Sequence, residues 1–434
     1  MAPGPEHWND DPSVRTNSMR LFLLLPLTPR LGATNGGARV LTQFLTEITA
    51  RHKVAVLYFR EADEPGADAF FRERCEYIEE VVRPASKKTL QGRLARYSRL
   101  ILSLFLRRPL WVEDWSSAEF ARRAHLLAQR FQPDIIQAEI HVMGQYFSAL
   151  KNMHASRVLV EYESSSRAAM YLQTLPQFLK RVIEPVEKIS WQRYEKLLYP
   201  QVDAIISFTE ADQQSISETA GETPIHTIPP GIVIPETPLD ALGSSPPSLL
   251  FVGNFYHPPN ADAARRLTES IFPAVEALIP DVRLFIVGES PPANLNRTNS
   301  KKIIITGRVP DVTPYLDQAA LLVAPLRFGG GIRIKILEGL AAGKAIVTTP
   351  LAAEGMNIQD GKQLAIAETD DEFIARIVQL LRNSEARLAL AKSARVWACE
   401  NIAWEQSIAK YETLYKTLLF QSGRSQWKAP VNQS

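Results

Sequence analysis

The stretch FGGGIRIKILEGLAAGK, residues 328–344, decides the fold class of its half of the chain. Apolar runs precede it at residues 321–325 and follow it at 345–350, and both are typical of buried strands. Between them, three consecutive glycines lead into a helical pattern. The N–H groups and the dipole at a helix start favour an anion, so the pattern predicts a phosphate site. The carboxylate of Glu338, deeper in the helix, suits the hydroxyl pair of a ribose. Together these features indicate a nucleoside diphosphate site.

The bulk composition bounds the class of protein. A chain of 434 residues is too long for one ordinary core, so two domains are expected. Hydrophobic residues make up 45% and charged residues 22%, as in soluble globular proteins. The 49 Lys and Arg residues nearly balance the 47 Asp and Glu residues, which argues against a dedicated nucleic-acid-binding protein.

The cysteines and the lengths of the apolar runs indicate the cellular compartment and the mode of membrane attachment. Cys75 and Cys399 lack the spacing of a metal site, so free thiols and a reducing, cytoplasmic compartment are expected. No apolar run approaches the ~20 residues that span a bilayer. Residues 1–18, rich in Pro, Asp and Asn, are expected to form a disordered tail.

The first half opens as a βαβ unit. Residues 21–27 and 53–59 have the character of buried strands, and between them a glycine-containing loop leads to a helix with an apolar face. This order predicts a doubly wound parallel α/β sheet, in which ligands lie beyond the carboxyl ends of the strands. Gly36 and Gly37 are therefore expected to face a ligand, although a tight turn would also favour glycine.

A basic and apolar segment follows at residues 83–108, where several arginines surround apolar side chains. Such a segment fits peripheral contact with an anionic surface at the inner face of a membrane. It equally fits an internal helix with a solvated basic edge.

Polar residues gather where two strands of this half end. Glu139 and His141 follow an apolar run that begins at residue 133, and the polar segment 163–167 follows the run 157–162. These positions fit a ligand site at the carboxyl edge of the sheet, whereas each one singly also fits a helix cap or a turn.

A stretch rich in Pro, Gly and Ser at residues 231–247 is the predicted linker. A second α/β series follows it, with three predicted strands that end at Gly253-Asn254, Gly288 and Gly307. Glycine is expected where backbone approaches a ligand closely. Two α/β halves of nearly equal length place the expected ligand site in a cleft between them.

These blocks together resemble the GT-B glycosyltransferases of the glycosyltransferase group 1 / family 4 type. The resemblance rests on FVGNF at 251–255, PNAD at 259–262, FIVG at 285–288, ITGRVPDV at 305–312, the stretch 329–349 and LAAEGM at 351–356. The first half agrees more loosely, through Gly36-Gly37, PD at 133–134 and PPGI at 229–232.

The resemblance implies two Rossmann-like domains that face each other across a cleft. Residues 19–240 would form the acceptor domain, residues 241–403 the nucleotide-sugar donor domain, and residues 404–420 a helix that crosses back to the first domain. Glu338 would bind the donor ribose, the glycine loop its diphosphate and residues 307–309 its base. The donor-site residues are Gly36, Gly37, Asn254, Gly307, Arg308, Val309, Phe328, Gly329, Gly330, Gly331 and Glu338.

Two departures from the family pattern concern the sugar and the diphosphate. Many members carry a second glutamate where this chain has Gly330, and many carry an Arg and a Lys in the segment that here is 254–260. The departing diphosphate still needs positive charge. Arg333 and Lys335 are therefore candidate catalytic cations, with Arg327 as a further one and a solvated helix edge as the alternative.

A third departure concerns the acceptor. Glu139 stands where members often have an active-site His, and His141 lies two residues further on. Either side chain is a candidate to orient the acceptor or to take its proton. The alternative for His141 is a structural role, which is the commoner one for a single His.

The predicted reaction moves a sugar from a nucleotide-diphosphate sugar to a hydroxyl acceptor, such as a glycan, a lipid-linked sugar or a small molecule. Retention of configuration follows from the resemblance alone. No cofactor is expected, and no metal, because no Asp-x-Asp motif is placed to hold one. The alternatives are a catalytically silent GT-B partner subunit and a nucleotide-sugar epimerase. A NAD-type Rossmann enzyme is disfavoured because the first strand lacks the glycine spacing.

Overall fold

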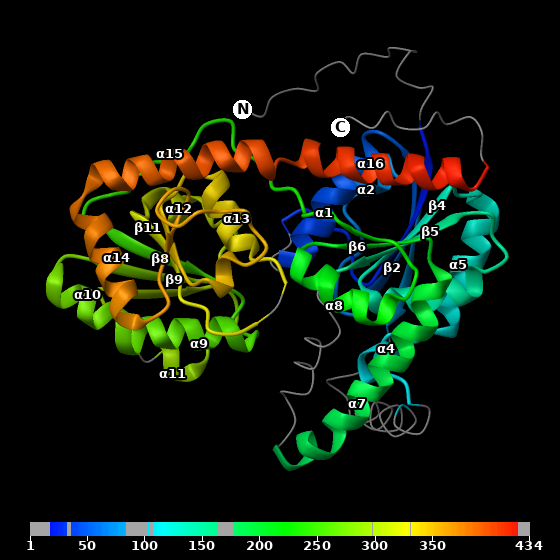
Figure 1. Cartoon of the computed structure of the whole chain (residues 1–434), viewed down its shortest axis with the longest axis horizontal. Helices are drawn as coiled ribbons and strands as arrows, with labels where there is room; N and C mark the ends of the chain where they lie inside the picture. The colour runs from blue at the N-terminus through cyan, green and yellow to red at the C-terminus, as the bar shows by residue number, and fades with distance from the viewer. Residues whose placement is uncertain are drawn as a thin grey trace.

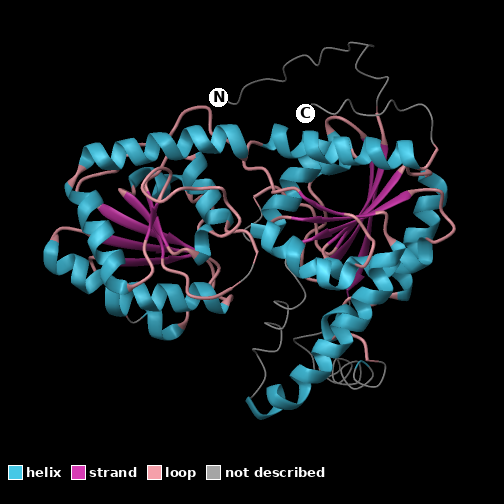
Figure 2. Ribbon diagram, in the orientation of Figure 1, coloured by secondary structure: helices cyan, strands magenta, loops and turns pink. Residues whose placement is uncertain are grey.

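The computed structural model describes residues 18–32, 36–83, 103, 107–162, 177–296, 298–329 and 331–423. These residues form two parallel sheets, each with helices on both faces (Figure 2). The first sheet has seven strands in the order β3-β2-β1-β4-β5-β6-β7, and the second has six in the order β10-β9-β8-β11-β12-β13. The prediction of two doubly wound α/β halves is confirmed.

The first sheet is buried on both faces. Its strands are β1 Arg20–Leu25, β2 Lys53–Glu61, β3 Tyr77–Arg83, β4 Ile135–Glu139, β5 Ser156–Glu161, β6 Ala204–Ser207 and β7 Ile225–Thr227. Its helices are α1 Gly36–Thr49, α2 Ala69–Arg74, α4 Leu110–Asp114, α5 Ala118–Phe131, the 3-10 segment η2 His141–Leu150, α7 Gln177–Leu198 and α8 Glu210–Ala220. Helices cover both faces, which explains why β1 after Arg20 is a continuous run of buried leucine and phenylalanine.

The second sheet is built in the same way around a single core. Its strands are β8 Ser248–Val252, β9 Arg283–Val287, β10 Ile303–Gly307, β11 Leu321–Ala324, β12 Ile346–Thr348 and β13 Ala365–Ile366. Its helices are α9 Pro258–Arg266, the π segment η5 Leu267–Ile271, α10 Phe272–Leu278, α11 Ala293–Asn296, α12 Thr313–Gln318, α13 Ile334–Ala341, α14 Asp370–Arg382 and α15 Ser384–Asn401.

Two crossings of the chain join the halves. Near residue 232 the chain passes from the first half to the second, and the backbone N–H of Ile232 donates to the carbonyl of Ile402 at 2.7 Å, where the chain returns. The returning helix, α16 Trp404–Gln421, packs on the first core through Trp404, Tyr411 and Tyr415. In Figure 1, α15 lies along the second half and α16 continues along the first.

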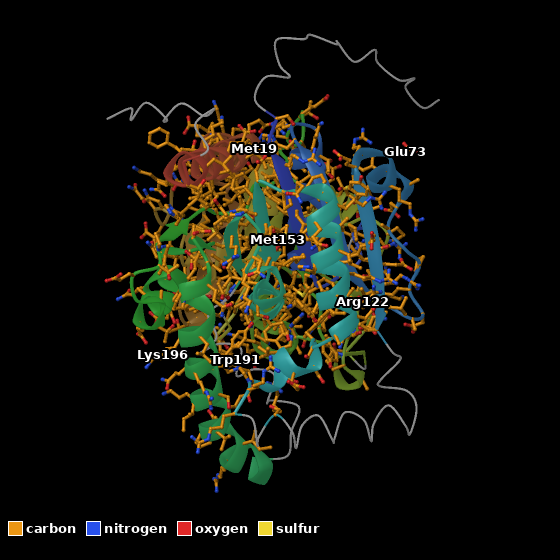
Figure 3. All side chains as sticks on the ribbon, turned by 90° about the vertical axis from the view of Figure 1, so that its right-hand side faces the viewer. Met19, Glu73, Arg122, Met153, Trp191 and Lys196 are labelled. Atoms are coloured by element: carbon orange, nitrogen blue, oxygen red, sulfur yellow. The ribbon has the colours of Figure 1, made fainter. Side chains whose placement is uncertain are left out.

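Helix α7 extends away from the first sheet, and Figure 3 shows its first part, which precedes Trp191 in the sequence, projecting from the body. The predicted basic membrane segment lies outside the described residues except for 83, 103, 107 and 108, and so does the predicted tail except for residue 18. Within the described part of the chain, no helix is both long and apolar enough to cross a bilayer. Cys75 and Cys399 are free thiols, and Cys399 is exposed.

Candidate functional site

The glycine loop joins β11 to α13. Gly329 has φ 119° and Gly331 has φ 71°, a backbone region that side chains other than glycine rarely adopt. A β-carbon on Gly329 would lie 3.0 Å from Pro259 Cγ, so the loop rests on the start of α9. Gly330 lies outside the described residues. The loop conformation therefore depends on glycine, and its position beside α9 brings two helix starts together.

Arg333 stabilises this loop from within. The sequence placed it in the first turn of the helix, but α13 begins at Ile334 and Arg333 precedes it. Its buried guanidinium donates to the carbonyl of Gly329 at 2.9 Å and also to the carbonyl of Gly331. The solvated-edge interpretation of Arg333 is thus wrong, and its side chain binds the loop backbone.

Lys335 connects α13 to the segment that follows β8. Its Nζ donates to Asn260 Oδ1 at 2.6 Å and lies 4.4 Å from the centre of the Phe251 ring. Burial and the charge of Arg333 lower the pKa of Lys335 to about 7, although the charge of Glu338 acts in the opposite direction. Asn260 in turn donates to the backbone carbonyl of Asn254 at 2.9 Å. Lys335 therefore reaches the segment in which the family's usual cations are absent.

Glu338 lies one turn deeper in α13 and forms an ion pair with Arg39 of α1. Burial raises the pKa of Glu338, while the charge and hydrogen bond of Arg39, and the charge of Lys335, act in the opposite direction. Sequence reasoning missed both Arg39 and Asn260. Each lies close to a predicted site residue in the sequence, but its partner in α13 is more than 70 residues away.

The remaining donor-site residues surround the loop or end neighbouring strands. Gly307 ends β10 with φ 68° and its carbonyl accepts from the N–H of Gly288 at 3.0 Å. Val309 packs against the second core, whereas Arg308 is exposed. Phe328 is 40% exposed beside the loop. The roles of these residues in donor binding stay predictions.

Arg327, the further candidate cation, is held by a carboxylate. Its Nε and Nη2 donate to the two carboxylate oxygens of Asp262 at 2.9 and 2.6 Å. The same carboxylate also accepts a hydrogen bond from Arg265. This pairing lowers the pKa of Asp262 and raises that of Arg327. Much of the charge of Arg327 is therefore already neutralised.

Gly36 and Gly37 begin a helix rather than forming a loop, because α1 starts at Gly36. A β-carbon on Gly36 would lie 3.2 Å from Ile334 Cγ1, at the start of α13. The glycine pair thus lies where the first half meets the candidate donor site of the second half. Gly36 allows the two helix starts to approach closely.

Glu139 ends β4 in a buried polar cluster. Gln137 Nε2 donates to its Oε1 at 2.5 Å and the hydroxyl of Tyr162 donates to its Oε2 at 2.9 Å. Burial raises the pKa of Glu139 to about 7, although both hydrogen bonds lower it. Tyr415 of α16 donates to Gln137 Oε1 and so joins this cluster to the helix that crosses between the halves.

His141 lies on the other face of the sheet, so the structure separates the two candidate acceptor residues. Its Nδ1 is 3.0 Å from Glu161 Oε2, and its ring meets Trp111 and Trp191 edge-on at centroid distances of 4.7 and 4.8 Å. Ile140, between the two candidates, has φ 69°, which is strained for a β-branched residue. Ile140 stands between the end of β4 at Glu139 and the start of η2 at His141. The catalytic roles of Glu139 and His141 stay predictions.

No group of three His, Cys, Asp or Glu side chains is arranged to hold a metal ion among the residues that the structure describes.

Two family models match the chain, one over the half that contains the first sheet and one over the half that contains the second sheet. The family described as Glycosyltransferase Family 4 matches residues 34–234, and the family described as Glycosyl transferases group 1 matches residues 246–383. The second match contains the glycine loop, Lys335 and Glu338. The chain belongs to the group 1 glycosyltransferases.

Solved structures share the fold of this group 1 glycosyltransferase over nearly its whole length. Sucrose-phosphate synthase from Thermosynechococcus elongatus has a TM-score of 0.68 at 14% identity and covers 93% of this chain and 100% of its own. HepE from Anabaena in complex with UDP-glucose has a TM-score of 0.59 at 12% identity, covering 93% and 100%. WaaG, a glycosyltransferase involved in lipopolysaccharide biosynthesis, has a TM-score of 0.61 at 16% identity, covering 91% and 99%. These likenesses confirm the GT-B fold.

Two curated proteins match shorter parts of the glycosyltransferase. A protein of the cps region of Klebsiella pneumoniae is 23% identical over 163 residues, which is 36% of this chain and 42% of that protein. An uncharacterized glycosyltransferase of Methanocaldococcus jannaschii is 28% identical over 93 residues, 21% of this chain and 24% of that protein. The matched region spans less than half the length of either relative.

Proposed function

We propose that this glycosyltransferase moves a sugar from a nucleotide-diphosphate sugar to a hydroxyl acceptor and binds the donor at the start of α13. The observation that carries the proposal is the convergence of the glycine loop, Lys335 and Glu338 at one helix start. A helix start supplies N–H donors and a positive dipole for phosphate, and a carboxylate one turn deeper suits ribose hydroxyls. The presence of UDP-glucose in the HepE structure supports the same class of donor.

The proposed transfer reaction requires that the negative charge on the departing diphosphate be stabilised. When the bond between the anomeric carbon and the diphosphate oxygen breaks, negative charge develops on the leaving group. A new bond forms from the acceptor oxygen to the anomeric carbon, and Glu139 is proposed to take the proton that the acceptor hydroxyl loses. Lys335 and the loop N–H groups are proposed to stabilise this charge. Arg333 is proposed to hold the loop in shape, since its guanidinium donates to the loop carbonyls. A metal ion is not required by this scheme.

The acceptor is proposed to bind at the carboxyl edge of the first sheet, near Glu139. Burial raises the pKa of the Glu139 carboxyl to about 7, which suits a group that exchanges a proton near neutral pH. The acceptor class is a glycan or a lipid-linked sugar, which the lipopolysaccharide role of the fold neighbour WaaG supports. Retention of configuration and peripheral attachment at the inner face of a membrane are part of the same proposal.

The test is a panel of UDP-, GDP-, ADP- and dTDP-sugars, screened first for thermal stabilisation and then for acceptor-dependent release of nucleoside diphosphate. One donor is expected to stabilise the wild type and to transfer its sugar. Glu338→Ala is expected to lose at least about tenfold in donor affinity while remaining folded, because hydrogen bonds to a charged group are among the stronger ones.

The outcomes separate the alternatives. Near-normal donor affinity in Glu338→Ala would refute the ribose role. Recovery of the donor with its sugar inverted at one carbon, and no transfer, would indicate an epimerase. Binding of a nucleotide sugar without turnover on glycan or lipid-linked acceptors would indicate a silent binding subunit.

A further inference from the structure

The two halves touch at the candidate donor site, through Gly36 at the start of α1 and Ile334 at the start of α13. Figure 1 shows α1 and α13 on the facing sides of the two halves. The side chain of Ile334, which meets Gly36, packs against the cores of both halves. Ile332 does the same. The contact is therefore apolar and fixed by packing, and any polar side chain beside it is held in a defined place.

Arg39 and Glu338 form their ion pair across this contact. The side chain of Glu338 is 17% exposed and that of Arg39 is 42% exposed, so the guanidinium reaches an inner carboxylate from the rim. A surface ion pair contributes little, but a carboxylate taken out of water needs a partner to keep its charge. Arg39 is the hydrogen-bonded partner of Glu338, and it comes from the opposite half of the molecule.

We propose that Arg39 is a positioning residue for the donor: it orients the Glu338 carboxylate, so that the carboxylate accepts hydrogen bonds from the ribose. A carboxylate offers about four acceptor positions, so one guanidinium leaves room for two hydroxyls. This inference rests on the proposed role of Glu338. It adds that the first half contributes to donor binding, and that the donor site is complete only while α1 and α13 are in contact.

The test measures binding of UDP, GDP and ADP, each against its 2′-deoxy form, by calorimetry. The variants are Arg39→Ala, Arg39→Lys, Glu338→Ala and the double variant Arg39→Ala/Glu338→Ala. Arg51→Ala is the matched control, because Arg51 follows the other end of α1 and pairs with Glu47 at 2.9 Å. The 2′-deoxy comparison reports ribose recognition, which a general loss of stability would not change selectively.

The wild type is expected to prefer the ribose form of its nucleotide by about tenfold or more. Arg39→Ala should lose most of this preference, Arg39→Lys should recover part of it, and the double variant should bind no worse than Glu338→Ala. Arg51→Ala should behave as the wild type.

Two results would overturn the inference. Tighter binding by Arg39→Ala would mean that Arg39 competes with the donor for Glu338, and an unchanged ribose preference would mean that Arg39 is only structural. If the wild type binds none of the three nucleotides and none of the nucleotide sugars in the donor panel, the proposed function itself fails, which is a distinct outcome.

Discussion

At the scale of single residues, Arg333 and Lys335 show how two nearby cations acquire different environments. The Arg333 guanidinium is directed back onto the loop carbonyls, whereas the Lys335 ammonium donates to the neutral Asn260 oxygen and lies over the Phe251 ring. A buried ammonium without a carboxylate in contact is costly for the fold and useful to an anionic ligand. Lys335 is thus the better candidate for diphosphate.

Replacing Lys335 with Met should therefore raise stability and weaken binding of the diphosphate. The pKa of Lys335 falls from 10.5 to about 7 on folding. The unfolded chain consequently binds more protons between these values, and wild-type stability rises with pH across that window. The gain in Tm of Lys335→Met should be largest at or below pH 7 and should shrink toward pH 10.

Thermal unfolding at several pH values checks the first part, and calorimetry with a nucleoside diphosphate and the free nucleoside checks the second. Lys335→Met should weaken binding of the diphosphate much more than that of the nucleoside. Arg333→Lys is the matched control, and it should lower Tm because lysine lacks the planar fork whose two nitrogens donate to the two loop carbonyls. A Tm gap that widens with pH would contradict the pKa assignment.

At the scale of secondary-structure elements, α16 is attached to the first sheet by a polar bond within an apolar interface. Tyr415 is fully buried and its hydroxyl donates to Gln137 Oε1, while Gln137 donates to Glu139 at 2.5 Å. This chain of bonds links the crossing helix to the end of β4. It also fixes which amide atom of Gln137 faces Glu139.

Tyr415→Phe should destabilise the protein by about 1–3 kcal/mol, since it leaves a buried amide oxygen without its donor. Urea unfolding measures the loss. Tyr411→Phe, on the same helix and also buried, is the control and should lose less. Equal losses in the two variants would mean that the cost comes from removing any buried hydroxyl of this helix rather than from the hydrogen bond to Gln137.

At the scale of the whole molecule, the two crossings of the chain pack against each other. A β-carbon on Gly231 would lie 2.5 Å from Trp404 Cδ2 and 2.6 Å from its Cα, so the outgoing and returning segments touch at backbone distance. The Ile232–Ile402 hydrogen bond lies beside this contact. Cooperative unfolding of the two halves should depend on the contact between Gly231 and Trp404.

Gly231→Ala should cost about 1–3 kcal/mol by overpacking and should separate the unfolding of the halves. Differential scanning calorimetry is the measurement, and a broader or split transition is the expected result. Val233→Ala, at an exposed position of the same connection, should leave the transition unchanged. A single sharp transition in Gly231→Ala at the wild-type temperature would contradict this account.

The fold could be predicted in its central parts and less well at its edges. Strands β8 and β9 end directly before Gly253 and Gly288, as the sequence predicts, because central parallel strands are continuous apolar runs. Strands β3, β7 and β13 lie at sheet edges and were not predicted. Their residues are shorter runs or only partly buried, so the apolar signal is weak.

The amino-acid sequence by itself determined the two α/β halves, the glycine loop at the start of α13 and the placement of Lys335 and Glu338 near it, because periodicity and glycine act locally along the chain. Only the tertiary structure decided what these side chains contact. It directs Arg333 onto the loop, brings Asn260 to Lys335 and Arg39 to Glu338, and places Glu139 and His141 on opposite faces of one sheet. Such pairings depend on how distant helices pack, and no local pattern encodes them.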